Sequence, residues 1–243
     1  MQQLDIVEVF SSIQGEGKYV GYRQVFVRLA GCNAVCAYCD TPSSRQPEVS
    51  GQIEITAGGR DFSSVDNPVT MSELADRINW LLKAPHHSVS FTGGEPLCQA
   101  EALVQLLPLV KGRIFLETNG TLPDELALVL PYVDIISMDI KLPSSARAEY
   151  WQEHERFLRL AAGHDLYVKI VVSGETGDEE FFRAVRLIAA VDARIPLVIQ
   201  PVTPVGDVSG IAPETVGKLQ ATALQLLQDV RVIPQTHKFI GQM

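Results

Sequence analysis

The sequence has 243 residues, of which 46% are hydrophobic and 20% are charged, an ordinary globular composition with enough chain for one sizeable core. The formal net charge of −9, with no run of Lys or Arg, argues against a nucleic-acid backbone as the ligand. No apolar run approaches the ~20 residues that span a bilayer, and the N-terminus has no basic region followed by a long apolar stretch. We therefore predict a cytoplasmic protein that binds neither nucleic acid nor a membrane.

Strands and helices alternate along the chain. β-Branched apolar runs predict a strand in "LDIVEVF" near the start and further strands at 24–30, 88–92, 113–118, 133–140, 166–173, 196–201 and 230–234. Apolar residues at helical spacing predict helices at 71–83 and 214–228, with weaker patterns near 100–110, 122–131, 147–162 and 178–191. The almost continuously apolar strands are typical of a parallel sheet covered by helices. We predict one α/β domain over residues 1–243, a partial, open barrel of about six βα units that resembles a TIM barrel; a doubly wound sheet is the alternative.

Residues 42–70 break this alternation. They are polar and rich in Ser, Pro and Gly, and we interpret them as a surface insertion in which "QIEIT" forms a short edge strand. A variable loop is the simpler interpretation of this segment, and a substrate lid is the other.

Polar residues follow almost every predicted strand. The motifs are "GC" (31–32), "TGGEP" (92–96), "ETNG" (117–120), "SMDIK" (137–141), "SGE" (173–175), "QPVTP" (200–204) and "PQTHK" (234–238). Ligands bind at the carboxyl ends of parallel strands, so this convergence predicts an enzyme site.

Three of the four cysteines, Cys32, Cys36 and Cys39, have the spacing C-x3-C-x2-C. An iron–sulfur cluster held by three thiolates keeps one iron open for a reactant. The alternative is a structural zinc site, which has four protein ligands. Its fourth ligand would be one of the histidines His86, His87, His154, His164 and His237. We interpret the fourth cysteine, Cys98, as an ordinary small buried residue.

The string "CNAVCAYC", followed by "GGEP", resembles the radical S-adenosylmethionine (SAM) superfamily. The resemblance implies a [4Fe-4S] cluster whose open iron binds SAM, and an electron transfer that cleaves SAM to a radical able to abstract hydrogen from a substrate. It implies a SAM site formed by Tyr38, Cys39, Asp40, Gly93, Gly94, Glu95, Ser137, Met138 and Asp139. Within this site Glu95 would accept from the SAM ammonium, and Tyr38 would pack on adenine. An ion pair between Asp139 and Lys141 is the structural alternative for that motif.

Two further residues point to a substrate. Arg28 lies within a predicted strand, where a buried guanidinium needs a partner, and either a substrate carboxylate or a structural salt bridge would serve. Thr41 follows Asp40 directly after the last cysteine, where its hydroxyl could bind a hard cation or simply cap a turn.

The ordered set "QGEG", "FVRLAGC", "CxxxCxYCDT", "TGGEPL", "ETNGT", "SMDIK", "QPV" and "QTHK" resembles the 7-carboxy-7-deazaguanine synthase family from near residue 8 onward. The resemblance implies a Mg²⁺-dependent carbon–nitrogen lyase of queuosine and 7-deazapurine biosynthesis. It would convert 6-carboxy-5,6,7,8-tetrahydropterin to 7-carboxy-7-deazaguanine with loss of ammonia, using SAM catalytically. It also implies a homodimer and a reducing partner such as a flavodoxin or ferredoxin. Family members commonly have an aromatic residue soon after "CDT", and this sequence departs from that pattern.

The resemblance also assigns roles to single residues. Cys32, Cys36 and Cys39 would hold the cluster and Thr41 would bind Mg²⁺, while Arg28, Glu16 and Thr41 would take part in catalysis. The residues implied to contact the pterin are Ile13, Gln14, Gly15, Glu16, Arg28, Thr92, Gln200 and His237, with Met243 as a further candidate. A glycyl-radical-enzyme activase can share the cysteine spacing and "GGEP" but has no need of Arg28 with "QGEG". A structural zinc protein is the alternative of another class.

Overall fold

The computed structural model describes residues 3–242, which fold around a ten-stranded sheet. Its strands are β2 (Ile6–Ile13), β3 (Arg23–Leu29), β4 (Ser50–Glu54), β5 (Phe62–Asp66), β7 (Ser88–Gly93), β8 (Ile114–Thr118), β9 (Ile135–Asp139), β10 (Asp165–Val172), β11 (Leu197–Pro201) and β12 (Val230–Val232). A separate two-stranded sheet joins β1 (Gln3–Leu4) to β6 (Val69–Thr70).

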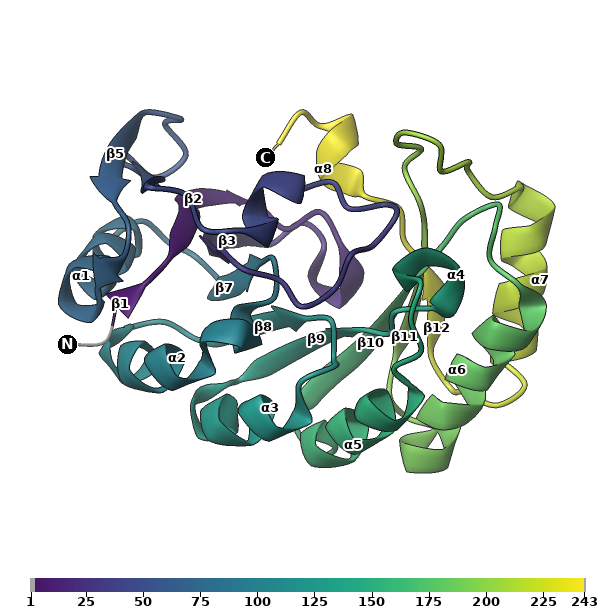
Figure 1. The fold of residues 1–243 in the computed structure, drawn as a ribbon. Helices are drawn as coiled ribbons and strands as arrows, with labels where there is room; N and C mark the ends of the chain where they lie inside the picture. The colour runs from purple at the N-terminus through teal and green to yellow at the C-terminus, as the bar shows by residue number, and fades with distance from the viewer. Residues whose placement is uncertain (1–2, 243) are drawn as a thin grey trace.

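The order of strands in the large sheet is β12-β11-β10-β9-β8-β7-β3-β2-β4-β5. From β3 through β7 to β12 every neighbouring pair is parallel, whereas β2 is antiparallel to β3. The two edges do not pair with each other, so the sheet is an open, curved half-barrel (Figure 1). This confirms the predicted partial barrel, and the doubly wound alternative is wrong.

Helices cover the convex side of the sheet (Figure 1). They are α1 (Met71–Leu81), α2 (Ala100–Leu106), α3 (Pro123–Val129), α5 (Trp151–Ala161), α6 (Asp178–Asp192) and α7 (Pro213–Ala223). Two short helices, α4 (Pro143–Ala146) and α8 (Thr236–Phe239), lie outside this layer and follow the carboxyl ends of β9 and β12. Each long helix buries an apolar stripe; Phe157 and Phe181, for example, are fully buried against the sheet, worth roughly 1.5–3 kcal/mol per side chain. No helix within residues 3–242 has the length and apolar character needed to cross a bilayer.

Residues that point into the barrel form layers along its axis. Near the amino ends of the strands, one apolar cluster comprises Phe115, Ile135, Tyr167 and Val198. Two residues further along the same four strands, the cavity-lining side chains are Glu117, Ser137, Lys169 and Gln200. Because side chains alternate with a period of two along a strand, both layers face inward. The interior of the half-barrel is therefore filled by apolar side chains at one end and lined by polar side chains at the other, where the cavity lies.

The polar insertion adds two strands to the sheet. β4 contains "QIE", as expected of the predicted strand, but it pairs with β2 on one side and β5 on the other. The prediction that this strand lies at the edge is therefore wrong, since β5 is the edge. Buried Glu54 explains why the hairpin is ordered, because its carboxylate accepts hydrogen bonds from Ser11 N–H (2.8 Å) and Arg60 N–H (2.9 Å).

Candidate active site

A cavity of ≈ 220 Å³ opens at the carboxyl ends of the parallel strands. The cysteine loop, the loop after β2, strands β7 to β11 and the segment around His237 all contribute lining residues. Among the predicted strand-end motifs, only residues 173–175 contribute none. Segments far apart in the sequence thus present their polar groups to one space.

Cys32, Cys36 and Cys39 all line this cavity as free, half-buried thiols. Their loop is anchored by hydrogen bonds from Ala37 N–H to the Ser145 carbonyl (2.9 Å) and from the Arg45 guanidinium to the Cys36 carbonyl (3.0 Å). Burial raises the pKa of Cys32 and of Cys36, so both hold their protons at neutral pH unless a metal displaces them. Cys98 is exposed, so the expectation that it is buried is wrong.

The spacing of these thiols bears on which metal group they fit. Zinc–sulfur bonds of ~2.3 Å in a tetrahedral site would bring the three sulfurs to within about 4 Å of one another. Within residues 3–242, the one trio of potential ligands whose atoms all lie within 4.8 Å is Glu16, Asp40 and His237, not the cysteines. Three free thiols, spread around one cavity, are a donor set that fits a larger cluster with an open position better than a single zinc ion.

The "TGGEP" turn packs against the start of the cysteine loop. A methyl group on Gly94 would overlap the carbonyl oxygens of Gly31 and Ser44, so only glycine permits this close approach. Glu95 is fully buried, and its carboxylate accepts from Thr118 Oγ1 (2.8 Å), Asn119 N–H (2.7 Å) and Leu97 N–H (3.1 Å). Burial raises the pKa of Glu95 to about 7, although these hydrogen bonds favour its ionised form. Gly93 also lines the cavity.

The predicted residues of β9 divide between the two faces of the sheet. Ser137 and Asp139 line the cavity, whereas the side chain of Met138 packs in the core behind it. Any contact between Met138 and a ligand in the cavity would therefore use its backbone. Asp139 Oδ2 pairs with Lys141 Nζ at 2.8 Å, as the ion-pair alternative anticipated, but its buried Oδ1 has no hydrogen-bond partner.

Tyr38 joins the cysteine loop to this end of β9. Its ring packs against a small apolar cluster that includes Val171 and Val202, and Lys141 Nζ lies 5.2 Å from the ring centre. Burial raises the pKa of Tyr38, so its hydroxyl stays protonated. The free Asp139 oxygen and the Tyr38 ring suit a ligand with hydroxyl groups and a flat heterocycle, which are the features of the adenosine part of SAM.

The loop after β2 contributes a second group of lining residues to the cavity. The carboxylate of Glu16 pairs with the Lys169 ammonium and accepts a hydrogen bond from Gln235 Nε2 (2.7 Å). Burial opposes ionisation of Glu16, but Lys169 outweighs it and the pKa of Glu16 falls to about 2. Ile13 lines the cavity, and so does Gln14, whose side-chain amide donates to Glu117 (2.7 Å) and Gln24 (3.0 Å).

Arg28 reaches this space from β3. Its Nε donates to Glu8 Oε1 at 2.8 Å, so the salt-bridge alternative is present. The guanidinium also lies 5.9 Å from the ring centre of Phe10 and lines the cavity. A guanidinium has five N–H donors, so the bond through Nε leaves the outer fork of the group for a carboxylate.

Two other predicted residues lie deeper in the polar layer. Thr92 donates to Glu117 at 3.0 Å, and Gln200 has a buried Oε1 without a hydrogen-bond partner. Glu117 also accepts from Ser90 at 3.1 Å, so this carboxylate organises the floor of the cavity. An unpartnered amide oxygen here suits a ligand that carries N–H donors, as a pterin does.

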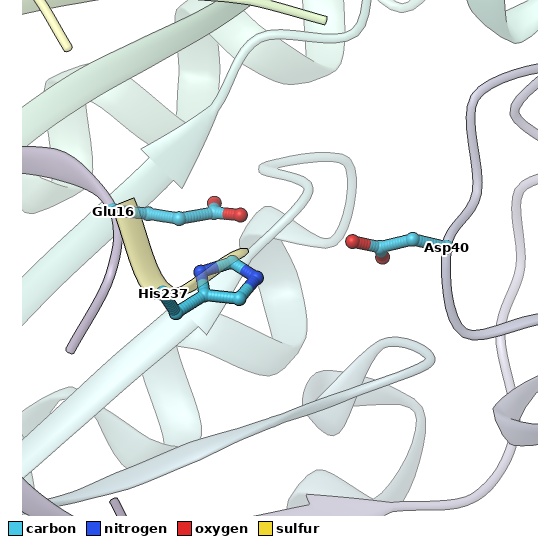
Figure 2. A group of neighbouring side chains, drawn as sticks. All are labelled: Glu16, Asp40 and His237. Carbon is cyan, nitrogen blue, oxygen red and sulfur yellow. The ribbon is translucent and has the colours of Figure 1, made fainter. Parts of the chain in front are cut away.

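The C-terminal segment closes the cavity over Glu16. The carbonyl of Gly15 accepts from Thr236 N–H (2.8 Å), and a side chain on Gly15 would overlap the His237 ring. In Figure 2 the carboxylates of Glu16 and Asp40 and the ring of His237 point toward one another. Gln235 Nε2 lies between the two carboxylates, 2.7 Å from Glu16 and 3.0 Å from Asp40, so an amide already bridges them. Met243 lies outside the described residues.

The sequence predictions left out three functional candidates: Glu117, Lys169 and Gln235. Glu117 and Lys169 are charged residues within otherwise apolar strands, and that pattern alone could have marked them as facing an interior polar site. Gln235 lies in the predicted strand-end motif "PQTHK", but the sequence assigned it no role of its own, because its contact with Glu16 comes from the packing of distant segments.

Comparison with known proteins shows to which family the chain belongs. A family model described as "Radical SAM superfamily" matches residues 27–188. Two relatives named 7-carboxy-7-deazaguanine synthase are 47% identical (Geobacter sulfurreducens, 98% of each chain) and 36% identical (Methanothermobacter thermautotrophicus, 99% of this chain and 98% of the relative). Among solved structures, QueE from Escherichia coli has a TM-score of 0.62 at 21% identity, covering 97% of this chain and 95% of its own, which shows a shared fold. The chain therefore belongs to the radical SAM superfamily and, within it, to the 7-carboxy-7-deazaguanine synthase family.

Proposed function

We propose that this chain converts 6-carboxy-5,6,7,8-tetrahydropterin to 7-carboxy-7-deazaguanine, contracting one ring and releasing ammonia. The observation that carries the proposal is one cavity with three free cysteines on one side and Arg28 and Glu16 on the other. The name shared by the relatives, at up to 47% identity over almost the whole chain, supports the same reaction.

In this proposal Cys32, Cys36 and Cys39 hold a [4Fe-4S] cluster, and SAM binds beside it. When bound, these groups supply one-electron cleavage of SAM and hydrogen abstraction from the substrate. Asp139 Oδ1 is the proposed acceptor for a SAM hydroxyl group, and Tyr38 the surface for adenine. Glu95 also lines the cavity, but three protein donors already bind its carboxylate, so we propose that it acts mainly by fixing the turn that contacts the cysteine loop.

The proposed substrate contacts use the opposite side. Arg28 binds the pterin carboxylate through its outer N–H groups, and a bidentate pair of this kind fixes orientation as well as charge. Glu16 stays ionised because of Lys169 and accepts N–H groups of the pterin, while Gln200 Oε1 accepts another. Fixing the carbon beside the carboxylate within reach of the cofactor is the chain's main contribution to rate.

We also propose that Mg²⁺ binds at Thr41 together with the substrate carboxylate. Thr41 lines the cavity next to Asp40, and its hydroxyl lies 3.4 Å from Ser44 Oγ. Oxygen ligands of this kind suit Mg²⁺, which keeps several waters and often binds through one or two protein groups plus substrate. Protein stripped of divalent ions should lose most of its activity and regain it with Mg²⁺; full activity without any divalent ion would contradict the assignment.

The test of the reaction is a single assay on anaerobically purified, reconstituted protein with reductant, SAM, Mg²⁺ and the carboxypterin. We expect 7-carboxy-7-deazaguanine and ammonia by mass spectrometry and a coupled assay, with no net consumption of SAM. SAM cleavage that ignores the pterin and yields no deazaguanine would refute the proposal.

Two assignments concern partners. We propose a small reducing protein as the electron source and a homodimer as the assembly. Light scattering coupled to size exclusion tests the dimer, since a mass near 26.6 kDa would show a monomer. Replacing dithionite by a reduced flavodoxin or ferredoxin in the assay tests the electron source; failure with every such protein would refute it.

A further inference from the structure

We propose that Lys169 is a positioning residue that joins the cofactor side of the cavity to its substrate side by holding Glu16 in the orientation that meets the pterin. The inference rests on the function proposed above, because it takes the pterin as the ligand of Glu16.

The contacts of Lys169 span both sides of the cavity. Its side chain is 13% exposed and projects from β10 into the polar layer, opposite Asp139 in the register of β9 and β10. Nζ pairs with Glu16 Oε2 and lies 3.6 Å from Asp139 Oδ2. One ammonium group therefore contacts a residue from the cofactor side and a residue from the loop that precedes β3.

The two carboxylates depend on Lys169 to different degrees. Asp139 has a second cation, Lys141, at 2.8 Å from the same oxygen. Glu16 has no second lysine or arginine within ion-pair distance among residues 3–242; its other neighbours are the neutral Gln235 amide, the His237 ring and the like-charged Asp40 carboxylate. Asp40 is itself paired with Lys238 at 3.4 Å. Removing Lys169 should therefore leave Glu16 without an ion-pair partner, while leaving Asp139 paired.

Lys169 supplies charge and not a proton. Burial lowers the pKa of this lysine, but Glu16 and Asp139 outweigh burial and hold the pKa well above its ordinary value. It therefore remains an ammonium throughout the pH range of an assay and is a poor acid for the departing ammonia. Its role is to fix the carboxylate that receives the substrate.

The experiment is a double-mutant cycle with Lys169→Met, Glu16→Gln and the double variant, each as reconstituted holoenzyme. Calorimetry would give the dissociation constants of the carboxypterin and of SAM separately. We expect Lys169→Met to weaken pterin binding by about tenfold or more and SAM binding by less than about threefold. When Glu16 is already replaced by Gln, adding Lys169→Met should weaken pterin binding by less than about threefold, because the carboxylate that Lys169 holds is no longer there. Lys18→Met is the matched control, since Lys18 pairs with Asp165 at 2.7 Å at the amino end of β10, and it should leave both constants unchanged.

Some outcomes would overturn the role of Lys169. Equal losses of pterin affinity in both backgrounds would show that Lys169 does not act through Glu16. A parallel loss of both affinities and of melting temperature would show a purely structural lysine. If Lys169→Met does not fold, Glu16→Gln is compared with the double variant instead, because neither of these two has an unpaired Glu16 charge. A loss of pterin affinity above about tenfold between these two variants would overturn the role of Lys169. Wild-type protein that binds no pterin would overturn both this inference and the proposed function.

Discussion

The two sides of the cavity each contain a glutamate, fully buried Glu95 and partly buried Glu16, and the two are held in opposite ways. Glu95, on the cofactor side, accepts hydrogen bonds from Thr118, Asn119 and Leu97, and burial raises its pKa to about 7. Glu16, on the substrate side, faces the Lys169 ammonium, which lowers its pKa to about 2 against the effect of burial.

This difference separates a residue held by neutral donors from one held by a cation, and it fits the roles proposed above, Glu95 in fixing the turn and Glu16 in binding the substrate. Neutral donors satisfy the oxygens of Glu95 and fix a turn, but they do not fully compensate a buried charge. The Lys169 ammonium compensates the charge of Glu16, so Glu16 stays ionised at the wall of the cavity. Glu95 is thus held by neutral hydrogen bonds and Glu16 by an ion pair, although the cofactor side also contains the ion pair between Asp139 and Lys141.

The largest expected effect tests the cofactor side as a whole. Cys36→Ala should abolish activity and the brown colour of the reconstituted protein, because two thiolates do not hold the cluster. Iron and sulfide analysis with the visible spectrum measures this. Cys98→Ala, at an exposed thiol, is the matched control and should keep iron, colour and activity.

Gly94→Ala should disrupt the contact between the "TGGEP" turn and the cysteine loop. The added methyl group would overlap the carbonyl oxygens of Gly31 and Ser44, both backbone atoms, so the loop has to move. We expect most of the cluster to be lost, read as iron per chain. Gly217→Ala is the control: it lies in α7 with open space around it, and alanine there should raise the stability by ~1 kcal/mol. Full iron occupancy in Gly94→Ala would contradict the packing argument.

Arg28→Lys tests the substrate side. Lysine keeps the charge but loses the fork that binds a carboxylate through two N–H groups, so kcat/KM should fall by about 100-fold, or ~2.7 kcal/mol. Iron content should not change. The comparison variant is Glu8→Gln, which removes the salt-bridge partner of Arg28 but keeps the fork, and it should cost much less. A kcat/KM within about threefold of wild type in Arg28→Lys would mean that Glu8, not substrate, is the partner that matters.

The smallest expected effect is on the pH dependence of stability, and it tests the contrast between Glu16 and Glu95 directly. Glu16 has a folded-state pKa below its ordinary value, so its stabilising contribution is present above pH 4.5 and is lost as the pH falls toward 2. Glu95 has a raised folded-state pKa, so its carboxyl destabilises the protein progressively as the pH rises from 4.5 to 7.

Urea unfolding of wild type, Glu16→Gln and Glu95→Gln between pH 3 and 7.5 checks these signs. The stability difference between wild type and Glu16→Gln should shrink toward the acid end. Wild type should lose stability relative to Glu95→Gln as the pH rises. If the two stability differences, wild type minus Glu16→Gln and wild type minus Glu95→Gln, changed with pH in the same direction, the contrast between the two glutamates would be wrong.

Much of the cofactor side could be predicted from the sequence, because its pieces are short and contiguous. The three cysteines lie within eight positions, and "TGGEP" directly ends β7. The strand pattern also predicted the open barrel, since parallel strands that are apolar on both faces need helices to cover them.

The rest depended on which face of a strand a side chain occupies and on contacts between distant segments. Met138 was expected in the site, but the strand period places its side chain behind the sheet. Lys169 and Gln235 were missed because their partner, Glu16, lies 153 and 219 positions away in the sequence. The edge of the sheet was assigned to "QIEIT" because β5, rich in Ser and Asp, has a weak strand pattern.

The bridge that Gln235 makes between Glu16 and Asp40 has a consequence for biogenesis. A growing chain exposes its cysteine loop and its "TGGEP" turn long before Gln235 leaves the ribosome. Iron and sulfide delivery can therefore begin on a chain whose pterin pocket is still unfinished. A nonsense codon between β12 and Gln235 would leave every strand of the sheet and the cysteine ligands in place but remove the bridge over Glu16, so we expect the product to take up iron and to bind the proposed substrate weakly.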